Sequence, residues 1–463
     1  MAASSALRIG IEDRGYQSLI QHLAEEGHQL FVYVDGVPFD ALWPMKNVTY
    51  VRERNDLLNT KVDFVISSDF PDSNVRTGAI YKNMPVIGHA REAIELELDR
   101  DLAFSFVQML QHKKLVTPPF IEFRDREEAI NFLSSKAQKS KSWVMKQHRD
   151  SPLDESDNRT VITHGKQDGH ANAINLLKLD KSPWFDEGVG GVRFEKFIEG
   201  VEVCFGAMFS ESYPEPNQAY WCREYKDAQN GDRSGVLTGE VGTLIGVLPG
   251  DSVISDIFSR IGACLRSCKV LTTGMIDFNT IIDSKGTMHF IEFTVRWGRP
   301  TLETQLAMIG TKRRLLGDAL FNAAIGLPTK MPYENNSFAL GVTVYDYGLP
   351  YTLSIPGRKG QPFKPPVPSS PLESVQPLFC NPSDPKKWIS SASEGRHFVS
   401  IGLCHDSLMD VIDYKSRLDS ARELLLQKAY SPLRDFKAPG MTWRDDIGKN
   451  MDTVIDAVKR VIR

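Results

Sequence analysis

The chain has few cysteines, and their spacing does not indicate a cross-linked or zinc-binding fold. Its 463 residues include six cysteines, and no two of them form the Cys-x-x-Cys pair found in many zinc sites. Cys264 and Cys268 are four residues apart, one helical turn, among apolar neighbours. We expect them to be ordinary core thiols. Neither a disulfide framework nor a zinc site is expected from these spacings.

Long apolar runs and long runs of one charge sign are also missing. No stretch approaches the ~20 apolar residues that a membrane-spanning helix needs, and the chain start lacks the apolar core of a signal peptide. The 55 Lys and Arg against 59 Asp and Glu give a net charge of -4. The composition therefore predicts a cytoplasmic globular protein with no membrane or nucleic-acid partner.

The length indicates several domains sharing a cleft, because a single hydrophobic core rarely grows this large. Residues 1–95 are expected to form a Rossmann-like parallel α/β domain. Short apolar segments are typical of buried parallel strands; they lie at 7–11, 30–34, 62–67 and 85–88, with a helix at 16–26 after the first.

Residues 96–335 are expected to form a second domain with antiparallel sheets. A helical pattern covers 93–111, and strand-like segments cover 143–147 and 190–209, the latter with a turn at Glu199 and Gly200. Segments 274–282 and 287–293 flank the turn 283–286, a strong hairpin signal. The polar stretch 148–158 reads as a loop, and 118–190 is expected to be a mobile lid.

Residues 336–463 are expected to form a small C-terminal α/β domain. The proline-rich run 356–371 leads to a strand at 398–402 and a helix at 407–429. The predicted fold class is therefore α/β and α+β multidomain.

The predicted hairpin carries a candidate metal site. Asp277 lies on its first strand, and Glu292 and Thr294 lie two residues apart on its second, so the last two share a face. Oxygen atoms of this kind suit a hard cation such as Mg²⁺. Two solvated carboxylates on an exposed sheet face are the alternative interpretation.

This hairpin resembles the metal-binding hairpin of the ATP-grasp family, in which a carboxylate strand precedes a Glu-x-Asn-x-Arg-x-Gly strand. Residues 192–203 are similar to the family's hinge. The resemblance assigns Glu195 through Phe197 to adenine and Glu202 to the ribose of ATP, and Lys146 to the phosphates. It implies Mg²⁺, or Mn²⁺, at Asp277, Glu292 and Thr294, with Arg296 offsetting phosphoryl charge.

Within that family the order of motifs resembles the phosphoribosylamine-glycine ligases over nearly the whole chain. Segments 234–242, 303–305 and 443–448 are similar to their Thr-Gly-Pro-Asn-Thr-Gly-Gly-Met-Gly, Glu-Thr-Gln and Arg-x-Asp-Ile-Gly motifs. The implied substrate residues lie in the loop from Lys226 to Thr238, including Arg233 and Ser234.

The chain departs from this pattern where substrates and phosphates would bind. An acid of the amino-acid site is replaced by Arg233, and an arginine suits a carboxylate or phosphate better than an ammonium group. Glycine is therefore not the expected substrate. The glycine-rich phosphate loop expected after Lys146 is replaced by the polar segment 148–157, and the metal-binding asparagine by Thr294.

The sequence thus predicts an ATP-dependent carboxylate-amine ligase that forms an amide through an acyl phosphate. Its partners are expected to be a small-molecule acid and amine, and the chain a monomer or homodimer. Two alternatives stay open: a genuine phosphoribosylamine-glycine ligase of purine biosynthesis, and a degenerate nucleotide-binding regulatory protein, since fold resemblance alone does not establish chemistry.

Overall fold

The computed structural model describes the chain in two compact units. The described residues are 6–462 apart from 14–15, 35–43, 68–83, 139, 148–159, 164–168, 180–184, 186–189, 212, 215–218, 232–237, 310–314, 328, 334–337, 348, 350–359, 379, 385, 391–394 and 407. The first unit comprises Met1–Ala93, Val203–Asp277 and Thr294–Arg463, and the second comprises Ile94–Glu202 and Phe278–Phe293. The three predicted domain segments stay a prediction.

The first unit begins with a parallel five-stranded sheet in the order β3-β2-β1-β4-β5. Its central strands are apolar on both faces, as expected of parallel strands covered on both sides. The predicted Rossmann-like sheet is confirmed, with β3 as an additional edge strand. Its elements are β1 (Arg8–Asp13), α1 (Gln17–Glu25), β2 (Gln29–Val34), β3 (Val48–Val51), α2 (Arg54–Asn59), β4 (Phe64–Ser67) and β5 (Val86–Ile87).

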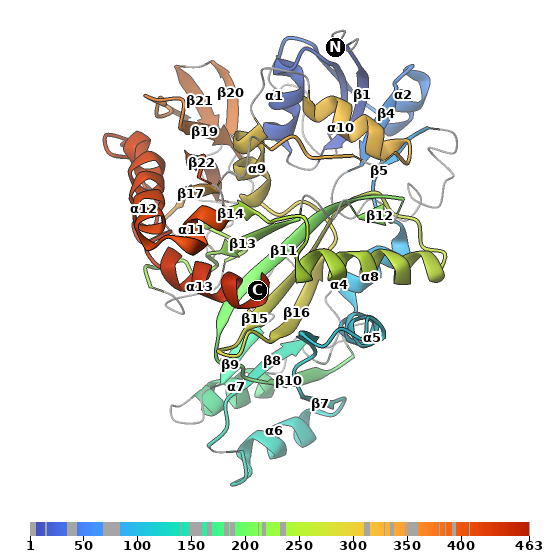
Figure 1. Ribbon diagram of the computed structural model, residues 1–463, viewed down its shortest axis with the longest axis vertical. Coiled ribbons are helices and arrows are strands. Elements are labelled where there is room, and N and C mark those ends of the chain that lie inside the picture. Colours follow the sequence, from blue (N-terminus) through green and yellow to red (C-terminus); the bar gives the residue numbers. More distant parts are fainter. Residues whose placement is uncertain are drawn as a thin grey trace. The chain divides into compact units, whose positions relative to one another are not determined.

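A buried carboxylate joins this sheet domain to α10 (Leu315–Ala324), which Figure 1 shows beside α1. Glu26 accepts the backbone N–H groups of Leu316 and Gly317, both at 3.0 Å, in the first turn of α10, where N–H groups have no partner inside the helix. Burial raises the pKa of Glu26, but the neighbouring side chains of His22 and His28 and the hydrogen bonds from these amides outweigh it and lower the pKa to about 2. Glu26 is therefore a charged cap of α10.

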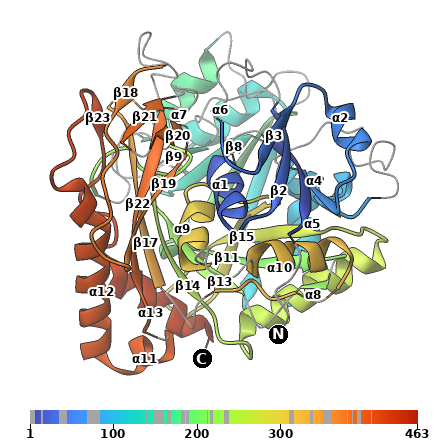
Figure 2. The same ribbon diagram turned by 90° about the horizontal axis from the view of Figure 1, so that it is seen from above.

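The first unit also holds an antiparallel sheet, in which β19, β22, β17, β14, β13, β11 and β15 follow one another. Figure 2 shows α12 alongside β22 and β17. The strands are β11 (Val201–Ser210), β13 (Tyr220–Glu224), β14 (Gly242–Val247), β15 (Gly274–Ile282), β17 (Phe338–Asp346), β19 (Glu373–Pro377) and β22 (Arg396–Cys404). The helices are α8 (Val253–Ser267), α9 (Thr301–Ile309), α11 (Leu408–Asp413), α12 (Lys415–Tyr430), η4 (Ser431–Leu433) and α13 (Met451–Ile462).

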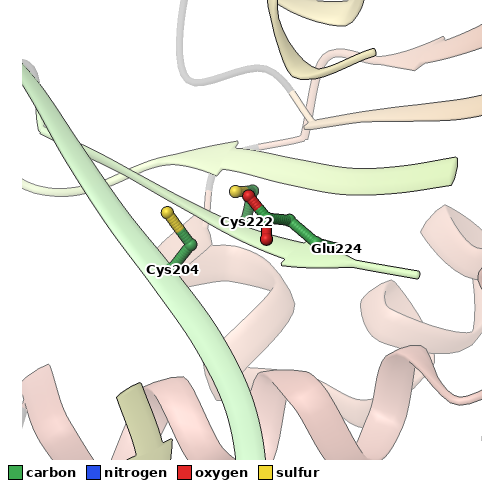
Figure 3. Close-up of side chains that lie close together, drawn as sticks. All are labelled: Cys204, Cys222 and Glu224. Atoms are coloured by element: carbon green, nitrogen blue, oxygen red, sulfur yellow. The ribbon is translucent and has the colours of Figure 1, made fainter. Parts of the chain in front are cut away.

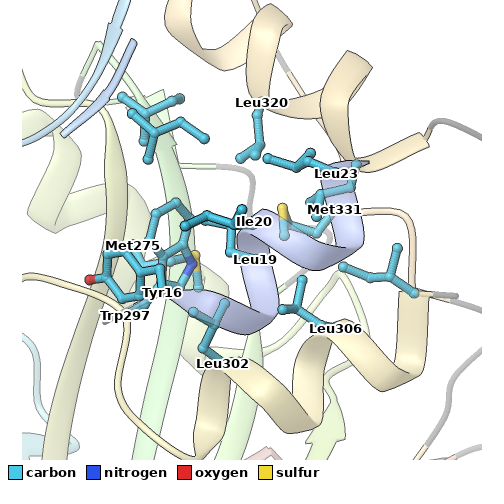
Figure 4. Close-up of a cluster of buried hydrophobic side chains, with 14 of the residues drawn as sticks. Tyr16, Leu19, Ile20, Leu23, Met275, Trp297, Leu302, Leu306, Leu320 and Met331 are labelled. Carbon is cyan, nitrogen blue, oxygen red and sulfur yellow. The ribbon is translucent and has the colours of Figure 1, made fainter. Parts of the chain in front are cut away.

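One hydrophobic core joins the parallel sheet to the antiparallel sheet within this unit (Figure 4). Side chains of α1, including Leu19 and Leu23, meet Leu302 and Leu306 of α9 and Leu320 of α10. The remaining short strands of the unit are β12 (Tyr213–Pro214), β18 (Pro362–Phe363), β20 (Cys380–Asp384), β21 (Lys387–Ser390) and β23 (Met441–Thr442). β18, β21 and β20 form a small separate sheet.

The second unit contains an antiparallel four-stranded sheet in the order β7-β10-β8-β9. Its strands are β7 (Phe120–Phe123), β8 (Trp143–Gln147), β9 (Thr160–Thr163) and β10 (Val192–Lys196), and its helices are α4 (Arg91–Leu98), α5 (Arg100–Met109), α6 (Arg126–Ser134) and α7 (Gly169–Lys178). β6 (Leu115–Val116) pairs in parallel with β16 (Met288–Thr294). α4 begins in the first unit, and β11, β15 and β16 also contribute residues to both units.

Two predicted helices were wrong in length, since each is two helices in the structure. The segment 93–111 is interrupted at Asp99, which has extended backbone and whose side chain accepts the N–H groups of Asp101 and Leu102 as the N-cap of α5. The segment 407–429 is interrupted at Tyr414, which is also extended. The hairpin is confirmed, with β15 and β16 joined through the turn at Asp283. Among the described helices, none combines the length and apolar character needed to cross a bilayer.

Candidate active site

The four-stranded sheet of the second unit has one apolar face and one charged face. Met145 and Phe194 are paired across β8 and β10 and belong to a core that α6 and α7 complete. Lys146 and Arg193 are the next pair along, so they point to the opposite face. Glu195 lies two residues beyond Arg193 on that same face. Strand alternation therefore places three buried ionisable residues side by side.

Lys146 and Glu195 form an ion pair on this charged face. The Nζ of Lys146 lies 2.9 Å from Oε2 of Glu195, and both residues are only 4% exposed. Burying two charges costs free energy that their attraction often only offsets, so such a pair is poor evidence of a stabilising role. A buried ion pair on a sheet face instead fits a site that handles charged ligands.

Arg193 attaches α5 to the same face. Its guanidinium bonds the carboxylates of Asp101 and Glu122 and lies 4.6 Å and 4.1 Å from the ring centroids of Phe104 and Phe120. Burial lowers the pKa of Arg193 to about 10, against the opposing effect of Glu195. This contact places the first turn of α5 beside Lys146.

Arg100, in that first turn, is a candidate that the sequence analysis missed. It is buried, its Nε donates to the carbonyl of Gln147 at 3.1 Å, and its Nη1 lies 3.8 Å from Oε2 of Glu292. Asn279 donates to the other oxygen of Glu292 at 3.3 Å. Arg100 had no distinguishing sequence pattern, whereas Asn279 shared strand phase with Asp277. The second unit thus brings Glu292 close to the end of the Lys146 strand.

The residues predicted to bind adenine and ribose follow β10. Phe197 is half-buried and its N–H donates to the carbonyl of Ser142, and Glu202 is half-buried at the start of β11. Gly200 lies between them, where a Cβ would stand 2.4 Å from the carbonyl oxygen of Ile282. Only glycine lets this turn pass the hairpin backbone so closely.

The other predicted metal residues, Asp277 and Thr294, belong to the first unit. Asp277 is 2% exposed and accepts the hydroxyl of Tyr220 at 2.6 Å. Burial, followed by the charge of Asp277, raises the pKa of Tyr220 well above its usual range. Thr294 is half-buried at the end of β16. Carboxylate and hydroxyl oxygens suit Mg²⁺, and the shared site with Glu292 stays a prediction.

A small pocket of the first unit opens at the carboxyl edge of the parallel sheet. Among its lining residues are Ser67 at the end of β4, His89 after β5, and Arg296, the predicted phosphoryl-site arginine. His89 Nδ1 lies 2.7 Å from Oγ1 of Thr272, and the ring of Tyr16 meets that of Trp297 edge-on at 5.8 Å (Figure 4). Ligands of open α/β sheets bind at this edge.

The ends of the predicted substrate loop are brought together. The carbonyl of Lys226 accepts both the N–H and the hydroxyl of Thr238, at 2.6 Å and 2.7 Å. Arg233 and Ser234 lie outside the described residues. Buried Arg444 bonds the carbonyl of Asp227 at 3.0 Å and pairs with Asp446. The C-terminal motif therefore holds the start of this loop.

The Glu-Thr-Gln segment contains a buried acid, Glu303, which lies next to α1. Glu303 is fully buried, and burial raises its pKa to about 7. Its Oε1 lies 3.2 Å from the hydroxyl of Ser18, which also contacts the carbonyl of Pro377. The Ser18 hydroxyl is positioned to donate to Glu303 or to Pro377, and it carries one proton, so the two carbonyl-type oxygens share one donor.

Comparison with known proteins supports the fold and leaves the activity to be tested. No protein-family model and no curated protein matches the chain. Phosphoribosylamine-glycine ligase from Thermotoga maritima is similar with a TM-score of 0.68 and 19% identity, over 95% of this chain and 100% of that one. The biotin carboxylase domain of Hydrogenobacter thermophilus 2-oxoglutarate carboxylase has a TM-score of 0.60 and 13% identity, over 98% and 96%.

An L-amino acid ligase from Bacillus licheniformis is similar with a TM-score of 0.55 and 13% identity, over 91% of this chain and 98% of that one. The resemblance therefore extends over the whole length of several ligases and carboxylases. The chain has the ATP-grasp fold.

Within this ATP-grasp fold, the predicted residues divide between the units. Those expected to bind the nucleotide, from Lys146 to Glu202, lie in the second unit with Arg100 and Glu292. Those expected to bind the acid and the amine lie in the first unit, with the pocket and the loop. The resemblance to phosphoribosylamine-glycine ligases, inferred from scattered motifs, is confirmed for the fold.

Proposed function

We propose that the chain is an ATP-dependent carboxylate-amine ligase. The observation that carries this proposal is the charged sheet face of the second unit. There, a buried Lys146–Glu195 pair stands next to the strand end at which Arg100 approaches Glu292. Apolar side chains would pack at these positions as well as this charged cluster does, so packing does not explain the charges.

The reaction is amide formation coupled to ATP cleavage. A carboxylate oxygen of the acid attacks the γ-phosphorus and the bond to ADP breaks, which gives an acyl phosphate. The amine nitrogen then attacks the acyl carbon, phosphate leaves, and the amine loses a proton. Lys146 and Arg100 would offset the charge on the phosphates from the second unit, and Arg296 would do so from the first.

The nucleotide would lie along the end of β10, with adenine at Glu195 through Phe197 and the ribose at Glu202. Asp277, Glu292 and Thr294 offer oxygen ligands of the type that Mg²⁺ or Mn²⁺ prefers. When bound there, the cation would neutralise phosphate charge. Asn279 and Arg100 would orient Glu292 toward it.

The acid and the amine would bind at the first unit's pocket and the loop from Lys226 to Thr238. Arg233 in that loop favours a substrate with a carboxylate or phosphate, rather than glycine held by its ammonium group. The glycine ligase of purine biosynthesis is the second candidate, favoured by the full-length similarity to the Thermotoga enzyme.

The test is phosphate release from Mg·ATP across a panel of acids and amines, including glycine with phosphoribosylamine. The native chain is compared with Glu292→Ala. Release that requires one acid and one amine, and that is lost in the variant, is the expected result. Release only with glycine and phosphoribosylamine would favour the second candidate. Nucleotide binding without release for any pair would replace the ligase by a nucleotide-binding regulatory protein.

A further inference from the structure

Two of the cysteines meet across neighbouring strands of the first unit. Cys204 on β11 is paired directly with Cys222 on β13, and both thiols are free and buried. Glu224 lies two residues after Cys222, so it shares that face of the sheet. Figure 3 shows the sulfur of Cys204 directed from its strand toward Cys222, with the Glu224 carboxylate beside them. The two cysteine sulfur atoms and one carboxylate oxygen of Glu224 lie within 4.8 Å of one another.

We propose that Cys204, Cys222 and Glu224 form a binding site for a thiophilic divalent cation of the zinc type. Two thiolates and a carboxylate are a ligand set that zinc accepts, with a fourth position left for water or another ligand. Tetrahedral zinc with sulfur at ~2.3 Å places its ligand atoms roughly 3.5–3.8 Å apart. The observed separations therefore need an adjustment of about 1 Å or less, which small side-chain rotations supply.

The charges around the cluster favour a cation. The carboxylates of Glu224, Glu240 and Asp277 all act electrostatically on Cys222. The same negative field that disfavours a lone thiolate attracts a positive ion. Binding would release the two thiol protons and take up one dication, so the net charge of the cluster would not change. The Nζ of Lys226 forms an ion pair with Oε2 of Glu224 at 3.0 Å. The other carboxylate oxygen of Glu224 can still bind the cation.

The site would also act on the predicted substrate loop. Lys226 begins this loop and is tied to Glu224 through its ammonium group. A cation on Glu224 would weaken that ion pair and change how the loop is held. The proposal does not depend on the ligase activity, because metal binding by this cluster can be measured without any substrate.

The experiment is titration of the reduced, metal-free full chain with Co²⁺, followed by displacement with Zn²⁺. We expect one equivalent of Co²⁺ to bind with a sulfur-to-cobalt charge-transfer absorption that Zn²⁺ removes. Cys222→Ala and Cys204→Ala should each weaken binding at least about tenfold. Glu224→Gln leaves both thiols in place and should weaken binding as well, which keeps the test valid if a cysteine variant fails to fold.

The matched control is the double variant Cys264→Ser with Cys268→Ser, at the end of α8, where a half-buried and an exposed thiol stand one helical turn apart. This variant should keep the full absorption and affinity. Absence of the band in the native chain would overturn the proposal. So would a band that survives in Cys222→Ala and Glu224→Gln, or one that disappears in the control variant.

Discussion

The two units each contain a group of buried charged side chains, and the two groups differ in what they contact: backbone N–H groups in the first unit and an opposite charge in the second. Glu26 in the first unit has a fully buried carboxylate that accepts backbone N–H groups of α10 at 3.0 Å and lies near two histidines. Lys146 and Glu195 in the second unit are also buried, but they form an ion pair with each other. A carboxylate that closes a helix end supports the fold. An ion pair on a sheet face contributes little to stability.

The largest expected effect tests the second group. Replacing the pair together, Lys146→Met with Glu195→Leu, leaves no unpaired charge, so the free energy of unfolding should stay within about 1 kcal/mol or rise. Phosphate release should nevertheless fall roughly 1000-fold, because the phosphates lose a positioned cation. Urea unfolding and steady-state phosphate release measure the two quantities.

Lys136→Met is the control for that variant, since Lys136 is an exposed lysine of the same unit with no assigned role. It should change phosphate release by no more than about twofold. A double variant that unfolds easily but still turns over would reverse the comparison between the two groups of charge.

The next effect concerns stability and tests Glu26. Its pKa of about 2 lies below the ordinary value of 4.5, so its stabilising contribution is present above pH 4.5 and is lost as the pH falls toward 2. Glu26→Gln should lower the free energy of unfolding by about 3 kcal/mol at pH 7. Unfolding curves at several pH values should show this difference shrinking below pH 4.5.

Glu25→Gln, one residue earlier and exposed on α1, should leave stability within about 0.5 kcal/mol of the native value. Turnover per folded molecule should be unchanged in both variants. A Glu26→Gln chain as stable as the native one at pH 7 would contradict the capping role.

Glu303 gives a smaller effect of opposite sign. Its raised pKa of about 7 means that its contribution to stability is complete below pH 4.5 and is lost as the pH rises through 7. The native chain should therefore lose about 2 kcal/mol from this group between pH 5 and 8. Glu303→Gln should remove that loss, whereas exposed Glu423→Gln should keep the native pH profile of unfolding. Identical profiles for the native chain and Glu303→Gln would refute the assignment.

The smallest effect tests Asn279 as a positioning residue for Glu292. Asn279→Ala should lower the turnover number about tenfold and raise the Mg²⁺ concentration needed for half-maximal rate. The KM for the acid should change little. Lys285→Ala, an exposed position in the turn of the same hairpin, is the control. An unchanged Mg²⁺ dependence in Asn279→Ala would remove Asn279 from the site.

Much of the fold could be predicted because its signals are local. The β15–β16 hairpin has apolar strands around a short polar turn, and the parallel strands are continuous apolar segments. β3 was missed because it is a half-exposed edge strand with no clear pattern. The helix breaks at Asp99 and Tyr414 were missed because the apolar periodicity continues on either side of them.

The candidate site was predictable only where a motif or a strand phase marked it. Glu292 was selected from its place on the predicted hairpin, and Lys146 and Glu195 through resemblance; the structure adds that Lys146 pairs with Glu195. Arg100 could not be selected, because an arginine at a helix start carries no signal until α5 is placed against β8 and β16.

By itself, the sequence determined the kinds of elements, the Rossmann-like start, the hairpin and the ATP-grasp resemblance. The elements depend on alternation, apolar runs and turn residues close together in the chain, and the resemblance depends on the order of short motifs along it. Only the tertiary structure decided that Arg193 anchors α5, that Glu26 caps α10, and that Cys204 faces Cys222. Strand register and helix docking set those contacts, and they arise from packing across the whole core, which no local spacing encodes.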